Sequence, residues 1–328
     1  MRIAEIILES RPSDFWSQLK QINVNHATGI LPSRSNVDWD TTCENPWDYG
    51  PLVKYRDTLE SFGLNLAVME DVPPMTKIRL GLPGRDEEID EFKKFITNLG
   101  RIGVGVLVYD WWCGLGWQRT RHVAASRGGA RVSAYSFAEQ DQTMLTPYGR
   151  VSADRLWEAV KYFLDRVIPV AEAAGVKLAM HPDDPPLPQV RGIDRIMSSV
   201  DNFYRLLELH PSEANGITFC QGNFALMEKD VVKAIEQVGS TKRIYFVHFR
   251  DIIGTATDFT EAFHDAGQND MAECVRAYQR VGYEGFLRTD HVPRLTGDET
   301  ETITGYSQQA RLHAVGYTQG LLEAARSR

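Results

Sequence analysis

The sequence predicts one (β/α)8 domain, a closed barrel of eight parallel strands with long loops at one end. Three observations predict it. Eight short β-rich runs alternate with longer amphipathic segments, and the 328 residues lie in the usual range for a single barrel. No glycine-rich phosphate-binding turn follows any of these runs, which favours a barrel over a doubly wound sheet. We therefore treat residues 1–328 as a single domain.

The candidate strands are short runs rich in apolar and β-branched residues. In chain order they are Ile3–Leu8, Ala27–Leu31, Leu64–Glu70, Gly103–Tyr109, Lys177–His181, Gly216–Cys220, Arg243–His248 and Gly285–Thr289.

Segments with the apolar spacing of helices lie between most of these runs. Asp86–Leu99 places Ile89 and Phe92 on one face, and Trp157–Ala174 does the same with Val160 and Phe163. Shorter helices are predicted at Phe203–Leu209, Val231–Val238 and Cys274–Val281. Crossovers of this length join parallel strands, as a barrel requires.

Three less regular stretches interrupt the alternation. They are Pro32–Tyr49, Asp110–Tyr148 and Pro293–Tyr306, of which the second is too long to be a simple connection. Long loops of this kind in barrels usually build or cover the active site, so we expect these three to do so.

Composition excludes several classes of partner. The net charge of −8 provides no general attraction to phosphate backbones or anionic membranes, so we expect neither nucleic acid nor membrane as a partner. A small molecule is the expected partner. No interface signature is visible, so association into a homo-oligomer stays open.

The cysteines and the N-terminal run indicate a cytoplasmic protein. The four cysteines, Cys43, Cys113, Cys220 and Cys274, form no CxxC pair and are too few for a disulfide framework. Met1–Leu8 is too short and too charged for a signal peptide, and no run reaches the roughly 18 apolar residues of a membrane span.

The last four predicted strands end in side chains that commonly bind metals. These are His181, Cys220, His248 and Asp290, each about one βα unit after the one before. Strands in a sheet lie about 5 Å apart, so the side chains at their carboxyl ends converge. A lone cysteine in a β-run is usually a small buried hydrophobic residue, but four such residues in register indicate a site. This set suits Mn²⁺, Fe²⁺, Co²⁺ or Zn²⁺ better than Mg²⁺ or Ca²⁺.

The stretch Phe259–Met271 follows the seventh predicted strand and carries two further polar candidates. Glu261 and His264 are three residues apart and lie near the metal if the barrel is correct. An acidic loop that caps the next helix through Asp270 accounts for the same residues, and both interpretations stay open.

In several stretches the chain resembles the mannonate dehydratase family, metal-dependent enzymes with a xylose-isomerase-like (β/α)8, or TIM, barrel. The resemblance runs across most of the chain. The matching stretches are Asn98–Val104, Trp117–Thr120, Met180–Pro186, Asn215–Gly222, Arg243–Arg250, Phe259–Met271, Arg288–His291 and Gly305–Tyr306.

The resemblance implies the dehydration of D-mannonate to 2-keto-3-deoxy-D-gluconate and water, in hexuronate (glucuronate) catabolism. It places a metal, most often Mn²⁺, on the same four strand-end residues, and it implies proton-transfer roles for His291 and Tyr306. Arg288 and Arg119 fall where family members keep arginines, which can bind a carboxylate.

Alternative roles stay open for these residues. Tyr306 can anchor a loop, and His291 can donate a hydrogen bond to a metal ligand. Arg119 and Arg288 can simply pair with acidic residues, and Trp117 can floor a sugar pocket or pack a lid.

The sequence departs from the family pattern around the expected substrate pocket. Gly116 stands where the family usually has aspartate, and Val292 stands where it has glycine. The segment Asp110–Tyr148 also differs, and the chain is shorter than typical members. The reaction class is therefore better indicated than the choice of sugar acid, and a dehydratase of another aldonic acid remains an alternative.

Three other functions compete with dehydration. A sugar isomerase or epimerase on the same barrel typically needs two glutamates among its ligands, whereas the late strand ends provide only Asp290. A barrel nuclease needs more ligands and a basic face. A non-catalytic relative is expected to lose ligands or the His291 and Tyr306 pair, and both are kept.

Overall fold

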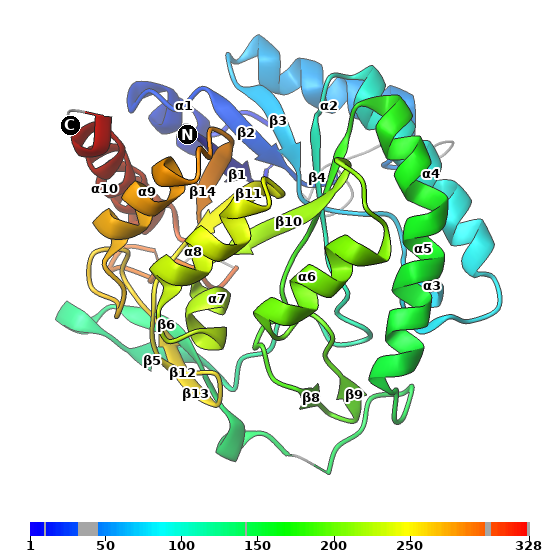
Figure 1. The fold of residues 1–328 in the computed structure, drawn as a ribbon. Helices are drawn as coiled ribbons and strands as arrows, with labels where there is room; N and C mark the ends of the chain where they lie inside the picture. Colours follow the sequence, from blue (N-terminus) through cyan, green and yellow to red (C-terminus); the bar gives the residue numbers. More distant parts are fainter. Residues whose placement is uncertain (10, 32–44, 142, 299–302, 327–328) are drawn as a thin grey trace.

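The barrel strands occur where the sequence predicts them. The computed structural model describes the chain apart from residues 10, 32–44, 142, 299–302 and 327–328. Eight parallel strands close in the order β1-β14-β11-β10-β7-β4-β3-β2, which confirms the (β/α)8 prediction (Figure 1). Their bounds are β1 Arg2–Ile7, β2 His26–Gly29, β3 Asn65–Met69, β4 Val106–Tyr109, β7 Lys177–Met180, β10 Asn215–Cys220, β11 Ile244–Phe249 and β14 Phe286–Thr289.

The predicted helices are confirmed, with ends shifted by a few residues. Ser152, Ser199, Asp230 and Asp270 each accept a hydrogen bond from a backbone N–H in the first turn of the helix that follows, which fixes where four of the helices begin. The helices are α1 Asp14–Gln21, α2 Tyr49–Ser61, α3 Thr76–Leu80, α4 Arg85–Arg101, α5 Ala153–Ala174, α6 Val200–Leu209, α7 Gln221–Met227, α8 Val231–Ser240, α9 Met271–Arg280 and α10 Gln308–Arg326.

Apolar side chains fill both layers of the barrel. A small interior cluster of Val68, Val108, Ala179 and Phe246 lies on strands β3, β4, β7 and β11. A much larger cluster joins the strands to the helices, and within it Phe92 of α4 meets Phe163 of α5 edge to face at 4.9 Å. This packing holds the strand ends in fixed positions, so the residues that follow them are held too.

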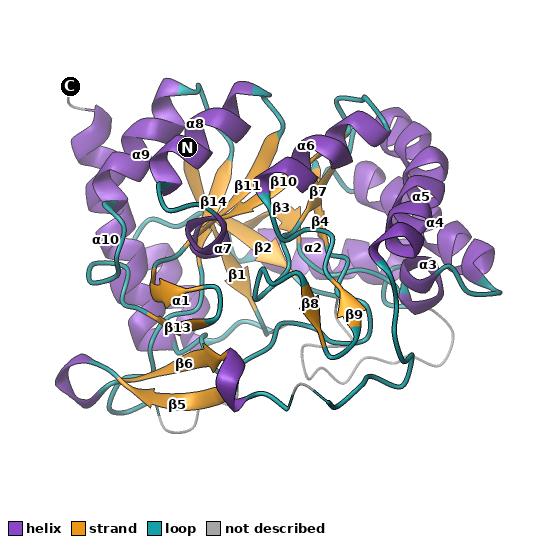
Figure 2. Cartoon of the chain, turned by 60° about the horizontal axis from the view of Figure 1, so that its bottom comes forward, coloured by secondary structure: helices purple, strands orange, loops and turns teal. Residues whose placement is uncertain are grey.

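A four-stranded antiparallel sheet lies beside the barrel and was not predicted. The long segment Asp110–Tyr148 contributes β5 (Arg121–Ala125) and β6 (Arg131–Ser136), and the loop after β11 contributes β12 (Ile252–Thr255) and β13 (Asp258–Glu261). Their order is β12-β13-β6-β5. Figure 2 shows β5, β6 and β13 on the same side of the barrel as the small hairpin of β8 (Gln189–Val190) and β9 (Ile193–Asp194).

Parts of two predicted loops lie outside the described residues. Residues 32–44, which include Cys43, make up most of Pro32–Tyr49, and residues 299–302 lie within Pro293–Tyr306. Among the helices that the structure describes, none combines the length and the apolar character that a bilayer span requires.

Candidate active site and metal centre

Three of the four predicted metal ligands meet at the carboxyl end of the barrel. Cys220 of β10 is in register with His248 of β11, and His181 directly follows β7. All three residues are buried, and one potential ligand atom from each lies within 4.8 Å of the others. The sequence argument from strand ends thus places these side chains as the structure does.

The two histidines face each other through ring nitrogens. Nε2 of His181 lies 3.1 Å from Nδ1 of His248. Nδ1 of His181 lies 2.7 Å from the carbonyl oxygen of Pro182, so this nitrogen carries the proton and donates it there. Burial lowers the pKa of His181 to about 3 and also lowers the pKa of His248, so both imidazoles are neutral at pH 7. Burial raises the pKa of the Cys220 thiol.

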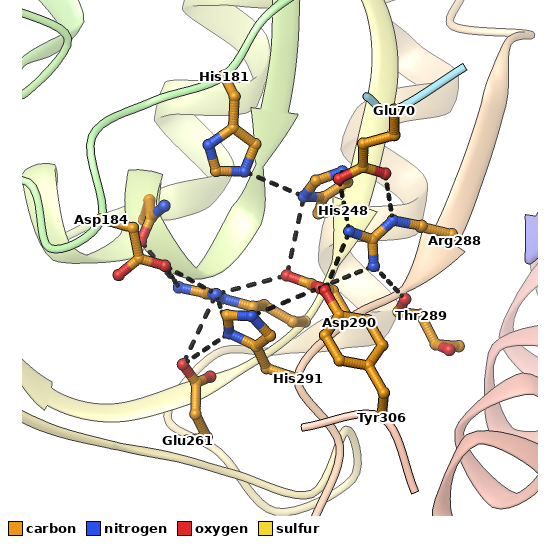
Figure 3. Close-up of polar contacts among 12 residues, drawn as sticks. Glu70, His181, Asp184, His248, Glu261, Arg288, Thr289, Asp290, His291 and Tyr306 are labelled. Atoms are coloured by element: carbon orange, nitrogen blue, oxygen red, sulfur yellow. Dashed lines mark hydrogen bonds and ion pairs between the residues drawn. The ribbon is translucent and has the colours of Figure 1, made fainter. Parts of the chain in front are cut away.

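Asp290, the fourth predicted ligand, follows β14 and lies at the edge of this cluster (Figure 3). One carboxylate oxygen is 3.7 Å from Nδ1 of His248, and the other accepts hydrogen bonds from Arg288 at 2.7 Å and from the Tyr306 hydroxyl at 3.0 Å. Burial alone would raise the pKa of Asp290, but Arg288 and the neighbouring His291 outweigh it and hold the pKa well below its ordinary value. The carboxylate is therefore ionised at neutral pH.

A second polar network surrounds His291. Arg119 pairs with Asp184 at 2.6 Å and also contacts Glu261, while Arg250 lies 3.1 Å from Asp184 and contacts Nδ1 of His291. These side chains are almost completely buried. Burial alone would raise the pKa values of the Asp184 and Glu261 carboxyl groups. The positive charges of Arg119 and Arg250 outweigh this effect and keep both pKa values below their ordinary values.

The cluster fits a divalent metal ion in its donor atoms and in its charge. Two nitrogens about 2.1 Å from one ion, at roughly a right angle, lie about 3 Å apart, as the two histidine nitrogens do. The site network holds one more carboxylate than it holds guanidinium groups, and buried charge of this kind is stabilised by a cation. Its members are Glu70, Asp184, Glu261 and Asp290 against Arg119, Arg250 and Arg288.

Comparison with known proteins identifies the family of this chain. The family model of D-mannonate dehydratase (UxuA) matches residues 15–142 and 136–328. The chain belongs to the mannonate dehydratase family.

Individual relatives are similar over nearly their full length. A mannonate dehydratase of Thermotoga maritima is 34% identical, with 94% of this chain and 92% of the relative covered, and one of Streptococcus uberis is 32% identical, with 87% and 89% covered. The crystal structure of mannonate dehydratase from Streptococcus suis serotype 2 superposes with a TM-score of 0.88 at 29% identity, covering 99% of this chain and 93% of that one. An L-ribulose 3-epimerase at 16% identity and a TM-score of 0.61 shares the fold.

Three residues that contact the candidate site residues in the structure were not among the sequence predictions. Glu70 directly follows β3 as His181 follows β7, so the strand-end rule would have found it had it been applied to the early strands. Arg250 lies two residues beyond His248, and Asp184 lies three residues beyond His181. Gly222 is part of the same arrangement, because a Cβ atom there would lie 2.4 Å from Nε of Arg250.

The two arginines proposed for substrate binding are already paired. Arg119 contacts Asp184 and Glu261, and Arg288 makes hydrogen bonds of 2.7–2.8 Å to Glu70 and Asp290. The structure therefore shows the pairing with acidic residues that the sequence had left as an alternative.

A cavity of about 410 Å³ opens beside the cluster of candidate metal ligands. It is lined by Glu70, Asp71, Val72, Pro73, Pro74, Met75, Thr76, Arg79, Val108, Tyr109, Asp110, Trp112, Gly116, Trp117 and His181. Trp117 also lies with its ring centroid 5.0 Å from that of His291, and Trp112 meets His181 edge to face. His264 is buried and is not among these described lining residues; burial lowers its pKa to about 4.

The two single-residue departures from the family pattern lie in different places. Gly116 lines the cavity with φ +69°, and a Cβ atom there would have nothing within 4 Å. Val292 is buried and packs with Ala310 and Ala314 of α10. Among the described residues, therefore, only the first of these departures changes the wall of the cavity.

Close contacts join the described ends of the segment that carries His291 and Tyr306. His291 has φ +45°, an uncommon conformation for a residue with a side chain. The N–H of Val292 donates to the carbonyl of Gly305 at 2.8 Å, and a Cβ atom on Gly305 would lie 3.3 Å from Cα of His291. This close approach brings His291 and Tyr306 together, with ring centroids 5.8 Å apart.

Proposed function

We propose that this chain dehydrates D-mannonate to 2-keto-3-deoxy-D-gluconate and water, as part of hexuronate catabolism. The observation that carries the proposal is the meeting of His181, Cys220 and His248 beside Asp290 in a member of the mannonate dehydratase family. His291 and Tyr306, with the chemistry needed for proton transfer, lie at the same place.

We propose His181, Cys220, His248 and Asp290 as the ligands of one divalent ion. Mn²⁺ is the ion we favour, with Fe²⁺, Co²⁺ and Zn²⁺ as alternatives that share these donor types. A bound divalent ion provides positive charge that stabilises the enediolate formed when a proton leaves the carbon beside a carboxylate.

The cavity beside the cluster is the proposed position of the sugar acid. Glu70 and His181 form its wall on the metal side, and Trp112 and Trp117 provide apolar surface against which carbon–hydrogen faces of a sugar can pack. Arg79 is the one guanidinium among the described lining residues, and its Nη2 lies 2.8 Å from Asp110. This pair offers a donor and an acceptor for the hydroxyl groups at the far end of the substrate.

Arg119 and Arg288 act on protein groups in this proposal. Each is paired with two carboxylates, so binding a substrate carboxylate through the paired nitrogens would require breaking a buried ion pair. Nδ1 of His291 donates to Glu261 at 3.0 Å in this scheme, and Arg119 and Arg250 hold that carboxylate in place, which leaves the Nε2 lone pair available for chemistry. His264 stays a structural residue of the loop after β13 in this scheme.

His291 and Tyr306 divide the proton transfers. Burial, reinforced by Asp290, raises the pKa of Tyr306, so its hydroxyl keeps its proton and is suited to donate it to the departing C3 hydroxyl group. His291 takes the C2 proton through Nε2, which gives the enediolate before the C3 hydroxyl group departs. Trp117, packed against the His291 ring, limits the rotation of this base.

The proposed partner and cellular compartment follow from the proposed reaction and from the cysteines. We propose a small-molecule sugar acid as the partner and the cytoplasm as the compartment, since Cys113, Cys220 and Cys274 are buried free thiols that a reducing compartment preserves.

The test is a panel of sugar acids offered to the Mn²⁺-loaded protein. D-mannonate, D-gluconate, D-altronate and a pentonate are incubated separately, and the 2-keto-3-deoxy product is measured for each. Product from D-mannonate alone supports the proposal. Product from another acid instead would assign the cavity around Gly116 to that acid, and an isomerised or epimerised sugar without loss of water would refute dehydration.

A further inference from the structure

Glu70 lies between the cavity and the cluster of candidate metal ligands. It directly follows β3 and lines the cavity wall. Its carboxylate accepts hydrogen bonds from Arg288 through Nε at 2.8 Å and Nη2 at 2.7 Å. One of its oxygens also lies 3.1 Å from Nε2 of His248. Figure 3 shows Glu70 on the side of the His248 ring away from His181.

The two nitrogens of His248 have different surroundings. Nδ1 faces the other proposed ligands, 3.1 Å from Nε2 of His181 and 3.7 Å from the Asp290 carboxylate. Nε2 is buried, and Glu70 is its one neighbour of hydrogen-bonding type among the described contacts. The Nε2 contact has the length of a hydrogen bond but lacks its full alignment.

We infer that Glu70 is a positioning residue that fixes the tautomer and the ring orientation of His248, so that its Nδ1 lone pair points at the metal. A neutral imidazole carries its proton on one nitrogen only, and the partner of that N–H decides which nitrogen is free to ligate. Glu70 accepts the Nε2 proton and thereby leaves Nδ1 free.

His181 is oriented by a different device. Its Nδ1 proton is donated to the backbone carbonyl of Pro182, which leaves Nε2 for the metal. His181 therefore ligates through Nε2 and His248 through Nδ1. The tautomer of each ring is fixed by a hydrogen-bond partner that is not itself a proposed ligand. A backbone carbonyl cannot be removed by substitution, whereas Glu70 can, so the His248 side is the one that is open to experiment.

Arg288 links Glu70 to the metal site a second time. Its Nη1 donates to Asp290 at 2.7 Å while Nε and Nη2 hold Glu70. One guanidinium thus fixes both the carboxylate that orients His248 and the carboxylate proposed as a ligand. This gives Arg288 a role in the metal site without any contact with substrate.

The inference rests on the metal part of the proposed function and not on the substrate. Its test therefore measures metal binding alone. Chelator competition gives the Mn²⁺ dissociation constant of wild type, Glu70→Ala and Glu70→Gln. Loss of a partner of this kind typically weakens metal binding about 10–100-fold, which is the effect expected for Glu70→Ala. Glu70→Gln retains an oxygen that accepts the Nε2 proton, so it is expected to recover part of the affinity.

Glu88→Gln is the matched control. Glu88 accepts the backbone N–H groups of Lys77 and Ile78 and makes no described contact with a proposed ligand. This variant is expected to keep the wild-type Mn²⁺ affinity. Unchanged affinity in both Glu70 variants, or an equal loss in Glu88→Gln, would overturn the inference.

A measurement on the wild type avoids any question of variant folding. In Zn²⁺-loaded protein with ¹⁵N-labelled histidine, NMR distinguishes a ring bound through Nδ1 with a proton on Nε2 from the reverse. The expected result is Nδ1 ligation and a slowly exchanging Nε2 proton for His248. Ligation of His248 through Nε2 would overturn the inference. A protein that binds metal in this way but does not dehydrate mannonate would refute only the proposed function.

Discussion

Metal binding to this protein is expected to release one proton, and that proton comes from Cys220. Only one proton is expected because the other three proposed ligands already lack a proton that metal binding would displace. Burial lowers the pKa of His181 to about 3 and lowers that of His248, so neither imidazole has an extra proton to lose at pH 7. Asp290 is already ionised, because Arg288 and His291 outweigh the effect of its burial.

Cys220 differs because burial raises the pKa of its thiol, so it is protonated at pH 7 in the absence of metal. A metal binds the thiolate, and its proton must leave. The release of one proton makes the observed dissociation constant fall about tenfold for each unit rise in pH, or about 1.4 kcal/mol per unit. This dependence holds while the thiol stays protonated in the metal-free protein.

Proton release is measured directly with a pH indicator as Mn²⁺ is added to weakly buffered protein near pH 7. Mn²⁺ is preferred because water bound to Zn²⁺ can itself lose a proton near that pH. The Cys220→Ser variant is the control, and it is expected to bind Mn²⁺ more weakly and to release close to no proton. Release of no proton by the wild type, or an unchanged release by Cys220→Ser, would remove Cys220 from the metal site.

Three further predictions address other residues. Tyr306→Phe is expected to lower kcat about 10²–10⁴-fold, the usual contribution of a proton donor, with little change in Mn²⁺ affinity; full activity would make Tyr306 a loop anchor. Arg79→Ala is expected to raise KM about 10–150-fold, since a hydrogen bond to a charged group contributes about 1.5–3 kcal/mol, while kcat changes little; an unchanged KM would remove Arg79 from the substrate site. Burial raises the pKa of Asp251 to about 6. Its contribution to stability is thus fully present below pH 4 and is lost as the pH rises to 6, by an amount on the order of 2–3 kcal/mol. Denaturation of wild type and Asp251→Asn across this range should show the wild type losing stability relative to the variant, and parallel curves would contradict the assignment.

Much of the barrel was predictable because its signals are local. Each strand is a short apolar run followed by a helix with its own periodicity, and a ligand at a strand end is marked by that position in the sequence. The meeting of His181, Cys220 and His248 at neighbouring strand ends was predicted in this way. Glu70 has the same position after β3, although the sequence prediction covered only the last four strand ends.

The rest depends on contacts between segments far apart in the chain. Strand β6 pairs with β13, more than 100 residues later. β6 is buried along nearly its whole length and β5 is mostly exposed, so neither β5 nor β6 has the alternation of a half-buried strand. The pairing of Arg119 with Asp184 and Glu261 likewise joins three separate segments. An arginine in a sequence does not show whether its partner is a substrate or a carboxylate of the protein itself.

The most direct test of the central proposal is the reaction of D-mannonate with Mn²⁺-loaded protein in D2O, followed by NMR. Loss of the C2 proton and the C3 hydroxyl group gives an enol, which takes up a solvent deuteron at C3 as it becomes the keto acid. The expected product is 2-keto-3-deoxy-D-gluconate carrying one deuterium at C3, with no product after the metal is removed by a chelator. A C2 epimer labelled with deuterium, or no reaction while metal is bound, would contradict the proposal.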